Sequence, residues 1–316
     1  MKEIGGYIEL DTYHLPMLHE GAIALNCGRN ALAYLLRARQ IKRLWIPKFI
    51  CDSVTGVCER ESVPYTLYDM GMDFLPSEEI RLADGEWLYF VNYYSQFDND
   101  QIEEYVHKFG RVIVDNAQSY FQPPIPSVDT LYTCRKYFGV PDGAFLYTDK
   151  TLSDEFPLDE SFERMSFLLG RFERTANEFY AGYIANNKYF SEQPIKRMSK
   201  LTANLLHGID YETVERRRRE NFEYLQDQFG TYNMLKPRIA SFMYPLMIDN
   251  GLVVRKKLQA QKIYIPTLWP TVFELTNKKN LEYQMAENIL PLPIDQRYGL
   301  EEMKYMVQEV KKCLIN

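Results

Sequence analysis

The sequence of 316 residues predicts an α/β fold built on a mostly parallel β-sheet, followed by a smaller α+β unit. Through the first half, short apolar runs rich in β-branched and aromatic residues alternate with amphipathic runs. After Asp149 this alternation stops. Regular alternation of strands and helices is typical of a parallel sheet covered by helices. We therefore expect a large α/β domain over residues 1–200 and a small α+β domain over residues 201–316.

Six short runs in the first half are predicted to be buried strands. They are apolar on both faces, as strands are when helices cover both sides of a sheet. These runs are residues 44–47, 64–68, 87–91, 112–115, 129–133 and 144–148. The amphipathic helices predicted between them are residues 30–39, 52–61 and 100–109. Asp52 and Asp100 are the expected N-caps, and Gly110 is expected to end the third helix.

The second half is predicted to be mainly helical before it returns to mixed structure. Aromatic and charged residues recur at helical spacing in residues 158–192 and 210–229. The elements expected after them are a strand at 242–248, a helix at 252–261, a strand at 263–265 and a closing helix at 300–314. The four arginines 216–219 lie in a helix between glutamates, so we interpret them as a solvated face. Arg218 falls on the apolar stripe and is expected to be partly buried and paired.

Composition limits the classes of protein that this chain can belong to. A net charge of −6 argues against a nucleic-acid partner, which needs a basic surface. Five cysteines without a CxxC pair or a histidine cluster predict reduced thiols and no structural metal. The first ten residues lack an apolar signal core, and no apolar run approaches the roughly 18 residues of a membrane span. We expect a soluble, cytoplasmic protein.

Three stretches contain residues that could carry chemistry. In residues 26–32, Gly28 and Arg29 lead into an Ala/Leu helix, and a helix N-terminus can bind phosphate, although Gly and Asn are also ordinary helix-entry residues. Asp115 ends a strand, at the edge where open α/β sheets bind ligands, or it caps a following helix. Lys136 follows the next predicted strand and could equally be a surface lysine.

Together, these three features are the parts that a pyridoxal phosphate (PLP) site needs. The helix start would hold the phosphate. A carboxylate such as Asp115 would keep the pyridine nitrogen protonated, so that the ring accepts electrons. A lysine such as Lys136 would bind the cofactor covalently and later shuttle a proton.

The chain resembles the DegT/StrS-type aminotransferases, PLP enzymes of fold type I that act mainly on nucleotide-linked keto sugars. The resemblance spans almost the whole chain. The segments that carry it are GRNALAYLL, IPKFICDSVTGVC, VIVDNAQSY, RKYFGVPDGAFLYTD, KRMSKLTANLL, RRRRENFEYL and the tail from residue 286 to residue 314. It implies a three-layer, aspartate aminotransferase-like large domain with a mostly parallel sheet and a smaller α+β C-terminal domain.

The resemblance also implies roles for the matching residues. Lys136 and Asp115 would be catalytic. The implied cofactor contacts are Gly28, Arg29, Asn30 and Thr133 at the phosphate, Gln118 near the ring hydroxyl, Cys51 at the ring face, and Arg197 from the partner subunit. The implied reaction is a ping-pong transfer of an amino group from an amino acid such as glutamate to a nucleotide-linked keto sugar, in a homodimer.

Two departures from the family pattern favour a second interpretation. Cys51 stands where the family places an aromatic or similar side chain on the ring, and Phe49 would face the ring only if the strand register shifted. Ile195 stands where the family has an asparagine that reaches the partner's cofactor phosphate, while Arg197 is kept. The chain could therefore be a relative that acts as a non-enzymatic binding or regulatory protein. The retained carboxylate and lysine speak against this, because a scaffold needs neither.

Overall fold

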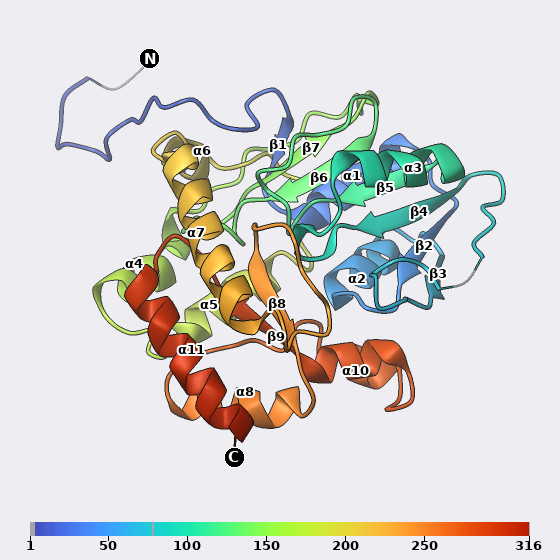
Figure 1. Ribbon diagram of the computed structural model, residues 1–316. Helices are drawn as coiled ribbons and strands as arrows, with labels where there is room; N and C mark the ends of the chain where they lie inside the picture. Colours follow the sequence, from blue (N-terminus) through green and yellow to red (C-terminus); the bar gives the residue numbers. More distant parts are fainter. Residues whose placement is uncertain (1–3, 78, 316) are drawn as a thin grey trace.

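A β-sheet forms the centre of the structure (Figure 1). Within residues 4–77 and 79–315, which the computed structural model describes, the main sheet has seven strands in the order β1-β7-β6-β5-β4-β2-β3. They are β1 (Ile23–Leu25), β2 (Arg43–Pro47), β3 (Tyr65–Tyr68), β4 (Glu86–Val91), β5 (Val112–Asp115), β6 (Asp129–Thr133) and β7 (Ala144–Tyr147). β2 to β6 are parallel, and β7 runs antiparallel to β6 and β1. The mostly parallel sheet predicted from the sequence is confirmed.

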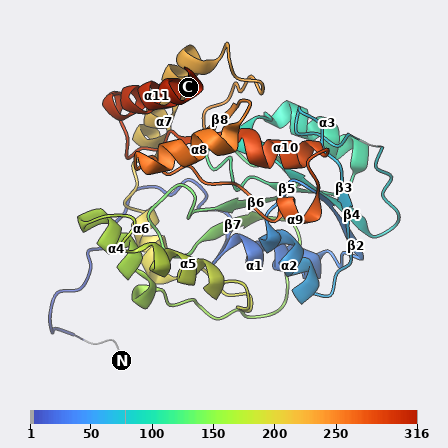
Figure 2. The same ribbon diagram turned by 90° about the horizontal axis from the view of Figure 1, so that it is seen from below.

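Helices cover both faces of this sheet and give the molecule three layers (Figure 2). On one face α1 (Gly28–Ala38) packs on β6 and β7 and contacts α2 (Asp52–Arg60). On the other face lie α3 (Asn99–Phe109) and α10 (Leu281–Asn288). Because both faces are covered, β5 is buried along its whole length, as its apolar sequence predicts.

The parallel register brings the carboxyl ends of three strands to one edge. Val91 at the end of β4 pairs with Asp115 at the end of β5. Asp115 in turn pairs with Leu131 of β6, and β6 ends two residues later at Thr133. Open α/β sheets bind their ligands at this edge.

Two of the three predicted helix ends differ from the structure. The N-cap of α3 is Asp98 and not Asp100, because the Asp98 side chain accepts a hydrogen bond from the backbone N–H of Gln101 at 2.9 Å and completes a capping box. The N-cap of α2 is Cys51, and Asp52 is the first helical residue. Gly110 ends α3 at φ 69°, as predicted.

The middle of the chain is helical, in agreement with the predicted change of character. It contains the 3₁₀ helix η2 (Phe162–Arg164) and the helices α4 (Ser166–Glu173), α5 (Tyr180–Tyr189), α6 (Lys200–Leu206) and α7 (Tyr211–Phe229). A further 3₁₀ helix, η1 (Tyr93–Ser95), follows β4 in the first half. Arg218 of α7 is buried and paired, as predicted. Its guanidinium donates hydrogen bonds to the Ser241 carbonyl at 2.8 Å and to Gln296 Oε1 at 2.9 Å, and lies 4.5 Å from the centre of the Tyr137 ring.

A second, two-stranded antiparallel sheet pairs β8 (Met243–Met247) with β9 (Ile289–Pro293). Beside it lie α8 (Gly251–Ala260) and α11 (Leu300–Ile315), whereas α9 (Val272–Leu275) lies next to α10. The strand predicted at residues 263–265 is wrong. A strand needs a hydrogen-bonded neighbour, and within the described residues β8 and β9 pair only with each other, so Ile265 instead packs by its side chain in the core.

The described residues contain two apolar cores. The larger core lies around the main sheet and also includes Phe242, Trp269 and Met285 from the second half. The smaller core joins α7, α8 and α11 to the second sheet. The second half contributes to both cores, so the two cores do not test the predicted domain boundary. The boundary between residues 200 and 201 stays a prediction. Among the helices of the described part of the chain, none has the length and apolarity needed to span a membrane.

Candidate active site

A cavity of about 650 Å³ opens at the carboxyl edge of the main sheet. Its walls come from the N-termini of α1 and α2, the ends of β4, β5 and β6, one face of α5 and the loop at residues 266–269. Seven of the nine predicted site residues line it: Gly28, Arg29, Cys51, Asp115, Gln118, Thr133 and Lys136. The fold thus brings together side chains that are more than 100 residues apart in the sequence.

Asp115 is buried at the floor of the cavity. One carboxylate oxygen accepts a hydrogen bond from the Tyr89 hydroxyl at 2.7 Å, and the other accepts one from the backbone N–H of Ala117 at 2.8 Å. A turn follows Asp115, so the alternative that it caps a following helix does not hold. Two hydrogen bonds fix the carboxylate while it still faces the cavity.

Lys136 faces the cavity, which makes its side chain accessible although protein surrounds it. Burial lowers the pKa of the Lys136 ammonium, and the negative charge of Asp115 opposes this shift. Its Nζ lies 5.4 Å from the centre of the Phe242 ring. Within residues 4–77 and 79–315 no hydrogen bond or ion pair holds Nζ. A lysine with a lowered pKa has more of the neutral amine that can attack a carbonyl carbon.

The start of α1 and the end of β6 form a tight polar corner of the cavity. The N-cap Cys27 makes no side-chain hydrogen bond to the helix, and the first N–H groups of an α-helix have no intrahelical acceptor. A Cβ on Gly28 would lie 2.8 Å from Cγ2 of Thr133, so a side chain at residue 28 would collide there. The Thr133 hydroxyl is buried without a hydrogen-bond partner among the described residues. This corner suits a phosphate group.

Cys51, and not Phe49, is the side chain that faces the cavity from this segment. Phe49 is 1% exposed in the core, where its ring meets Trp269 edge to face at 4.6 Å. Burial raises the pKa of the Cys51 thiol, so it is neutral at physiological pH. The expected register therefore holds, and the cavity has a thiol in place of an aromatic side chain.

The side chain of Gln118 holds the backbone of the 3₁₀ helix η1. Its Oε1 accepts a hydrogen bond at 2.7 Å from the N–H of Tyr94, a residue that has a φ of 52°. A non-glycine residue in this left-handed region is uncommon and needs such support. The position of Gln118 is compatible with the predicted contact to the ring hydroxyl, which stays a prediction.

Two predicted site residues do not line the cavity. Asn30 points into the protein, where its amide donates hydrogen bonds to Asn26 Oδ1 and to the Pro194 carbonyl, both at 2.8 Å. Each helical residue turns by 100°, so the third residue of α1 leaves the face that Gly28 and Arg29 share. The Nε of Arg197 donates to the Phe156 carbonyl at 3.2 Å. A role for Arg197 in a partner subunit stays a prediction.

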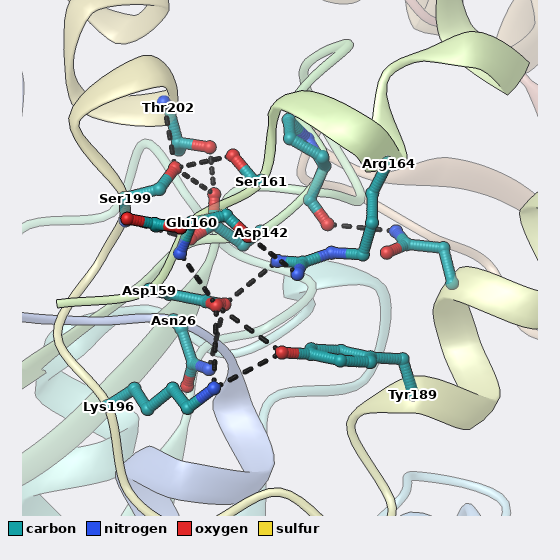
Figure 3. Close-up of polar contacts among 12 residues, drawn as sticks. Asn26, Asp142, Asp159, Glu160, Ser161, Arg164, Tyr189, Lys196, Ser199 and Thr202 are labelled. Atoms are coloured by element: carbon teal, nitrogen blue, oxygen red, sulfur yellow. Dashed lines mark hydrogen bonds and ion pairs between the residues drawn. The ribbon is translucent and has the colours of Figure 1, made fainter. Parts of the chain in front are cut away.

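A buried carboxylate, that of Asp159, holds the segment that leads into the polar corner (Figure 3). Asp159 accepts hydrogen bonds from the amide of Asn26 at 3.1 Å and from Arg164 at 2.8 Å. Asn26 lies just before the turn at Gly28, and its backbone carbonyl accepts the N–H of Gly143 at 2.6 Å. Segments far apart in the sequence thus fix the entry to α1.

Sequence reasoning missed several residues of the cavity. Tyr89 holds Asp115, Arg135 precedes Lys136, and Phe242 and Trp269 form apolar walls. The position of Arg135 next to Lys136 was a usable signal. Trp269 gives no such signal, because its segment reaches the cavity only through the tertiary fold.

The donor set fits PLP. The tight corner with an unpartnered hydroxyl suits its phosphate, Asp115 suits its pyridine nitrogen, and Lys136 suits its aldehyde. The fold is similar to that of an aminotransferase of the DegT/DnrJ/EryC1/StrS type. No protein-family model matches the sequence, and no curated protein matches it either.

Solved structures with this fold cover nearly the whole chain. An aminotransferase of this type from Brucella abortus is 14% identical, with a TM-score of 0.62 over 92% of this chain and 86% of that chain. The sugar aminotransferase CalS13 from Micromonospora echinospora is 12% identical, with a TM-score of 0.61 over 92% and 87%. NtdA from Bacillus subtilis, with bound cofactor PMP, is 12% identical, with a TM-score of 0.66 over 96% and 79%.

Proposed function

We propose that this protein is a PLP-dependent aminotransferase that moves an amino group from an amino acid, such as glutamate, to a keto sugar linked to a nucleotide. The observation that carries this proposal is the shared cavity of Lys136 and Asp115, with the polar corner of α1 and β6 beside them. The likeness in fold to sugar aminotransferases supports the class of reaction.

When bound, PLP would supply an aldehyde for amino-group attachment and a ring that accepts electrons. Gly28, Arg29 and Thr133 would bind its phosphate. Asp115, held by Tyr89 and Ala117, would keep a proton at the pyridine nitrogen. Such a fixed charge in a buried site is worth several kcal/mol of transition-state stabilisation, about 3 kcal/mol for one good contact.

Lys136 would have two successive tasks. Its Nζ would first hold the cofactor at the aldehyde carbon. After the amino group of the donor displaces it, the freed amine would move a proton between the substrate carbon and the cofactor carbon. The pKa of Lys136, lowered by burial, suits both tasks because each needs the neutral amine. The amino group would then pass to the keto acceptor by the reverse sequence.

Borohydride labelling tests the proposal. The purified protein with PLP is expected to show an absorbance band near the violet edge, and borohydride should remove the band and fix the cofactor on the peptide that contains Lys136. Lys136→Ala should abolish both the label and transamination from labelled glutamate while the protein stays folded. Lys188→Ala, which removes another lysine of the cavity, should still be labelled at Lys136. A Lys136→Ala variant that transfers amino groups at a rate comparable to that of the unchanged protein would contradict the proposal.

One observation favours the second candidate, a binding or regulatory protein without catalysis. The cavity has Cys51 where the resembled family stacks an aromatic or similar side chain. The same experiment separates the candidates. A protein that takes up PLP at Lys136 but transfers no amino group from any amino acid to any keto sugar supports the second one.

A further inference from the structure

The cavity contains more positive than negative side chains. Four cationic residues line it: Arg29, Arg135, Lys136 and Lys188. Two acidic residues line it, Asp52 and Asp115. The proposed function assigns Asp115, Lys136 and Arg29, but it assigns nothing to Arg135.

Within the part of the chain that the structure describes, Arg135 is held in place without an acidic partner. Its Nη2 donates a hydrogen bond to Oδ1 of Asn187 on α5, and its guanidinium carbon lies 4.9 Å from the centre of the Phe190 ring. Burial lowers the pKa of Arg135, and the nearby charge of Arg29 acts in the same direction. Two close guanidinium groups repel each other unless an anion lies between them.

Arg164 provides a comparison within the same fold. Its guanidinium lies 5.5 Å from the centre of the same Phe190 ring, yet it has a carboxylate partner in Asp159 at 2.8 Å (Figure 3). For Arg135 and Arg29, by contrast, residues 4–77 and 79–315 supply no carboxylate within 4.0 Å. The fold thus gives a carboxylate partner to Arg164, which does not line the cavity, and gives none within the described residues to Arg135, which lines it.

The acidic residue whose charge acts on Arg135, Asp142, is engaged elsewhere. Asp142 attracts Arg135 at longer range, but its carboxylate accepts hydrogen bonds from the backbone N–H and the hydroxyl of Ser199, both at 2.9 Å, and from the hydroxyl of Thr202 (Figure 3). These bonds tie Asp142 to the start of α6. The charge of Arg135 is therefore available to a ligand.

We propose that Arg135 is an anion-binding residue of this cavity, and that with Arg29 and the hydroxyl of Thr133 it binds a phosphate group. The hydroxyl of Thr133 is buried and unpartnered, and it lies on the same short segment as Arg135. A planar guanidinium donates two parallel hydrogen bonds to phosphate oxygens, which a lysine cannot do. The source of the phosphate, cofactor or substrate, rests on the proposed function.

Binding of PLP and of pyridoxal, which lacks the phosphate, tests Arg135 directly. Dissociation constants are measured by absorbance titration of the cofactor-free protein. Arg135→Met keeps the length of the side chain and removes the charge. We expect the PLP dissociation constant to rise about 10- to 100-fold, as the loss of a hydrogen bond to a charged group predicts, while that of pyridoxal changes little.

Arg297→Met is the control, because it also removes a cation that lies over an aromatic ring, 5.1 Å from the centre of the Tyr298 ring, and Arg297 does not line the cavity. It should leave the preference for PLP over pyridoxal unchanged. Arg135→Lys, which keeps the charge but not the paired donors, should give an intermediate preference and replaces Arg135→Met if that variant does not fold. If Arg135→Met and Arg135→Lys weaken PLP and pyridoxal equally, Arg135 is a packing residue and the proposal is wrong.

Inorganic phosphate distinguishes the two sources of the anion. Its binding is measured by ³¹P NMR on the cofactor-free protein and on holoenzyme reduced with borohydride. If the cofactor supplies the phosphate, the reduced holoenzyme should not bind the ion at Arg135. If the substrate does, the reduced holoenzyme should bind it and Arg135→Met should not.

The failure of this proposal and that of the proposed function give different results. A protein that binds no PLP but binds phosphate through Arg135 contradicts the function and supports the anion site. A protein that is labelled at Lys136, yet shows no effect of Arg135→Met on PLP or on phosphate, supports the function and contradicts the anion site.

Discussion

The hydroxyl of Thr133 is buried where the described protein offers it no partner. An unpaired buried hydroxyl destabilises the folded chain, so its removal should affect folding and ligand binding in opposite directions. Thr133→Val should leave the cofactor-free protein as stable or more stable by about 1 kcal/mol, and should weaken PLP binding about tenfold. Denaturant titration and absorbance titration measure the two effects. Equal PLP affinity in both proteins would show that the hydroxyl has no phosphate to bind.

At the scale of single residues, the sequence predicted which residues could carry the chemistry, but it did not predict the direction of every side chain. Asp115 and Lys136 line one cavity because the parallel register aligns the strand ends, which strand order alone predicts. Asn30 is the first residue of α1 whose side chain turns away from the cavity. The sequence did not predict this direction, because side-chain directions near a helix N-terminus depend on which residue begins the helix. Arg135 and Tyr89 were missed because their partners lie on other elements.

At the scale of elements, the N-terminus of α3 offers a stability test. Asp98 accepts the Gln101 N–H, whereas Asp100 lies within the helix. Asp98→Ala should lower the free energy of unfolding by about 1 kcal/mol, the usual cost of losing an N-cap. Asp100→Ala serves as the matched control and should cost less, since it loses only a favourable charge near the helix dipole. The reverse order in thermal or denaturant unfolding would contradict the assigned cap.

The segment before β1 makes folding stability depend on pH. The buried ring of His19 contacts the Tyr120 carbonyl at 2.8 Å and the Tyr147 hydroxyl at 3.1 Å, and burial lowers the pKa of His19 to about 4. Between pH 6.5 and 4 the unfolded chain binds a proton that the folded protein does not. Stability should therefore fall as the pH drops through this range, by about 3 kcal/mol in all.

Replacement of this ring checks the pH effect. His19→Gln should reduce the slope of unfolding free energy against pH between 6.5 and 4, whatever its effect on stability at pH 7. His14→Gln, a substitution of an exposed histidine, should keep the slope of the unchanged protein. An unaltered slope in His19→Gln would assign the acid sensitivity to other groups.

Strands and helices were predictable where they follow a simple period. β5 and β6 have the predicted bounds because β5 begins with three β-branched apolar residues and both strands are almost entirely buried. β9 escaped prediction because its sequence, ILPLP, contains two prolines, which disfavour strands. They are tolerated in a sheet of two strands, where each strand has a free edge. Residues 263–265 look like a strand but find no neighbour with which to pair.

At the scale of the whole molecule, an apolar surface on two helices supports the homodimer that we propose. This α4–α5 patch consists of Leu169, Phe172, Tyr180, Tyr183 and Ile184, all exposed, with Phe172 92% exposed. Tyr183 and Ile184 also line the cavity, so a second copy seated on the patch would cover part of the site.

Light scattering at micromolar concentration tests the assembly. We expect the mass of a dimer, and Phe172→Asp should shift it toward the monomer by placing a charge in the interface. PLP affinity should fall in the same variant if the partner completes the cavity. Val253→Asp, at a residue 52% exposed on α8, is the matched control and should stay dimeric. A monomeric mass for the unchanged protein with PLP bound would contradict the dimer.

The walls of the cavity extend along the chain from Cys27 to Trp269, and this span has a consequence during protein synthesis. The ribosome completes β5 and Lys136 long before it reaches the loop at residues 266–269. A nascent chain therefore exposes the carboxyl edge of its sheet for a large part of translation, which proceeds at about 5–20 residues per second. If the protein binds PLP as we propose, the cofactor can be enclosed only after this loop has emerged, and its capture would belong to the last stage of folding. Until then, the open edge is a surface that chaperones can recognise.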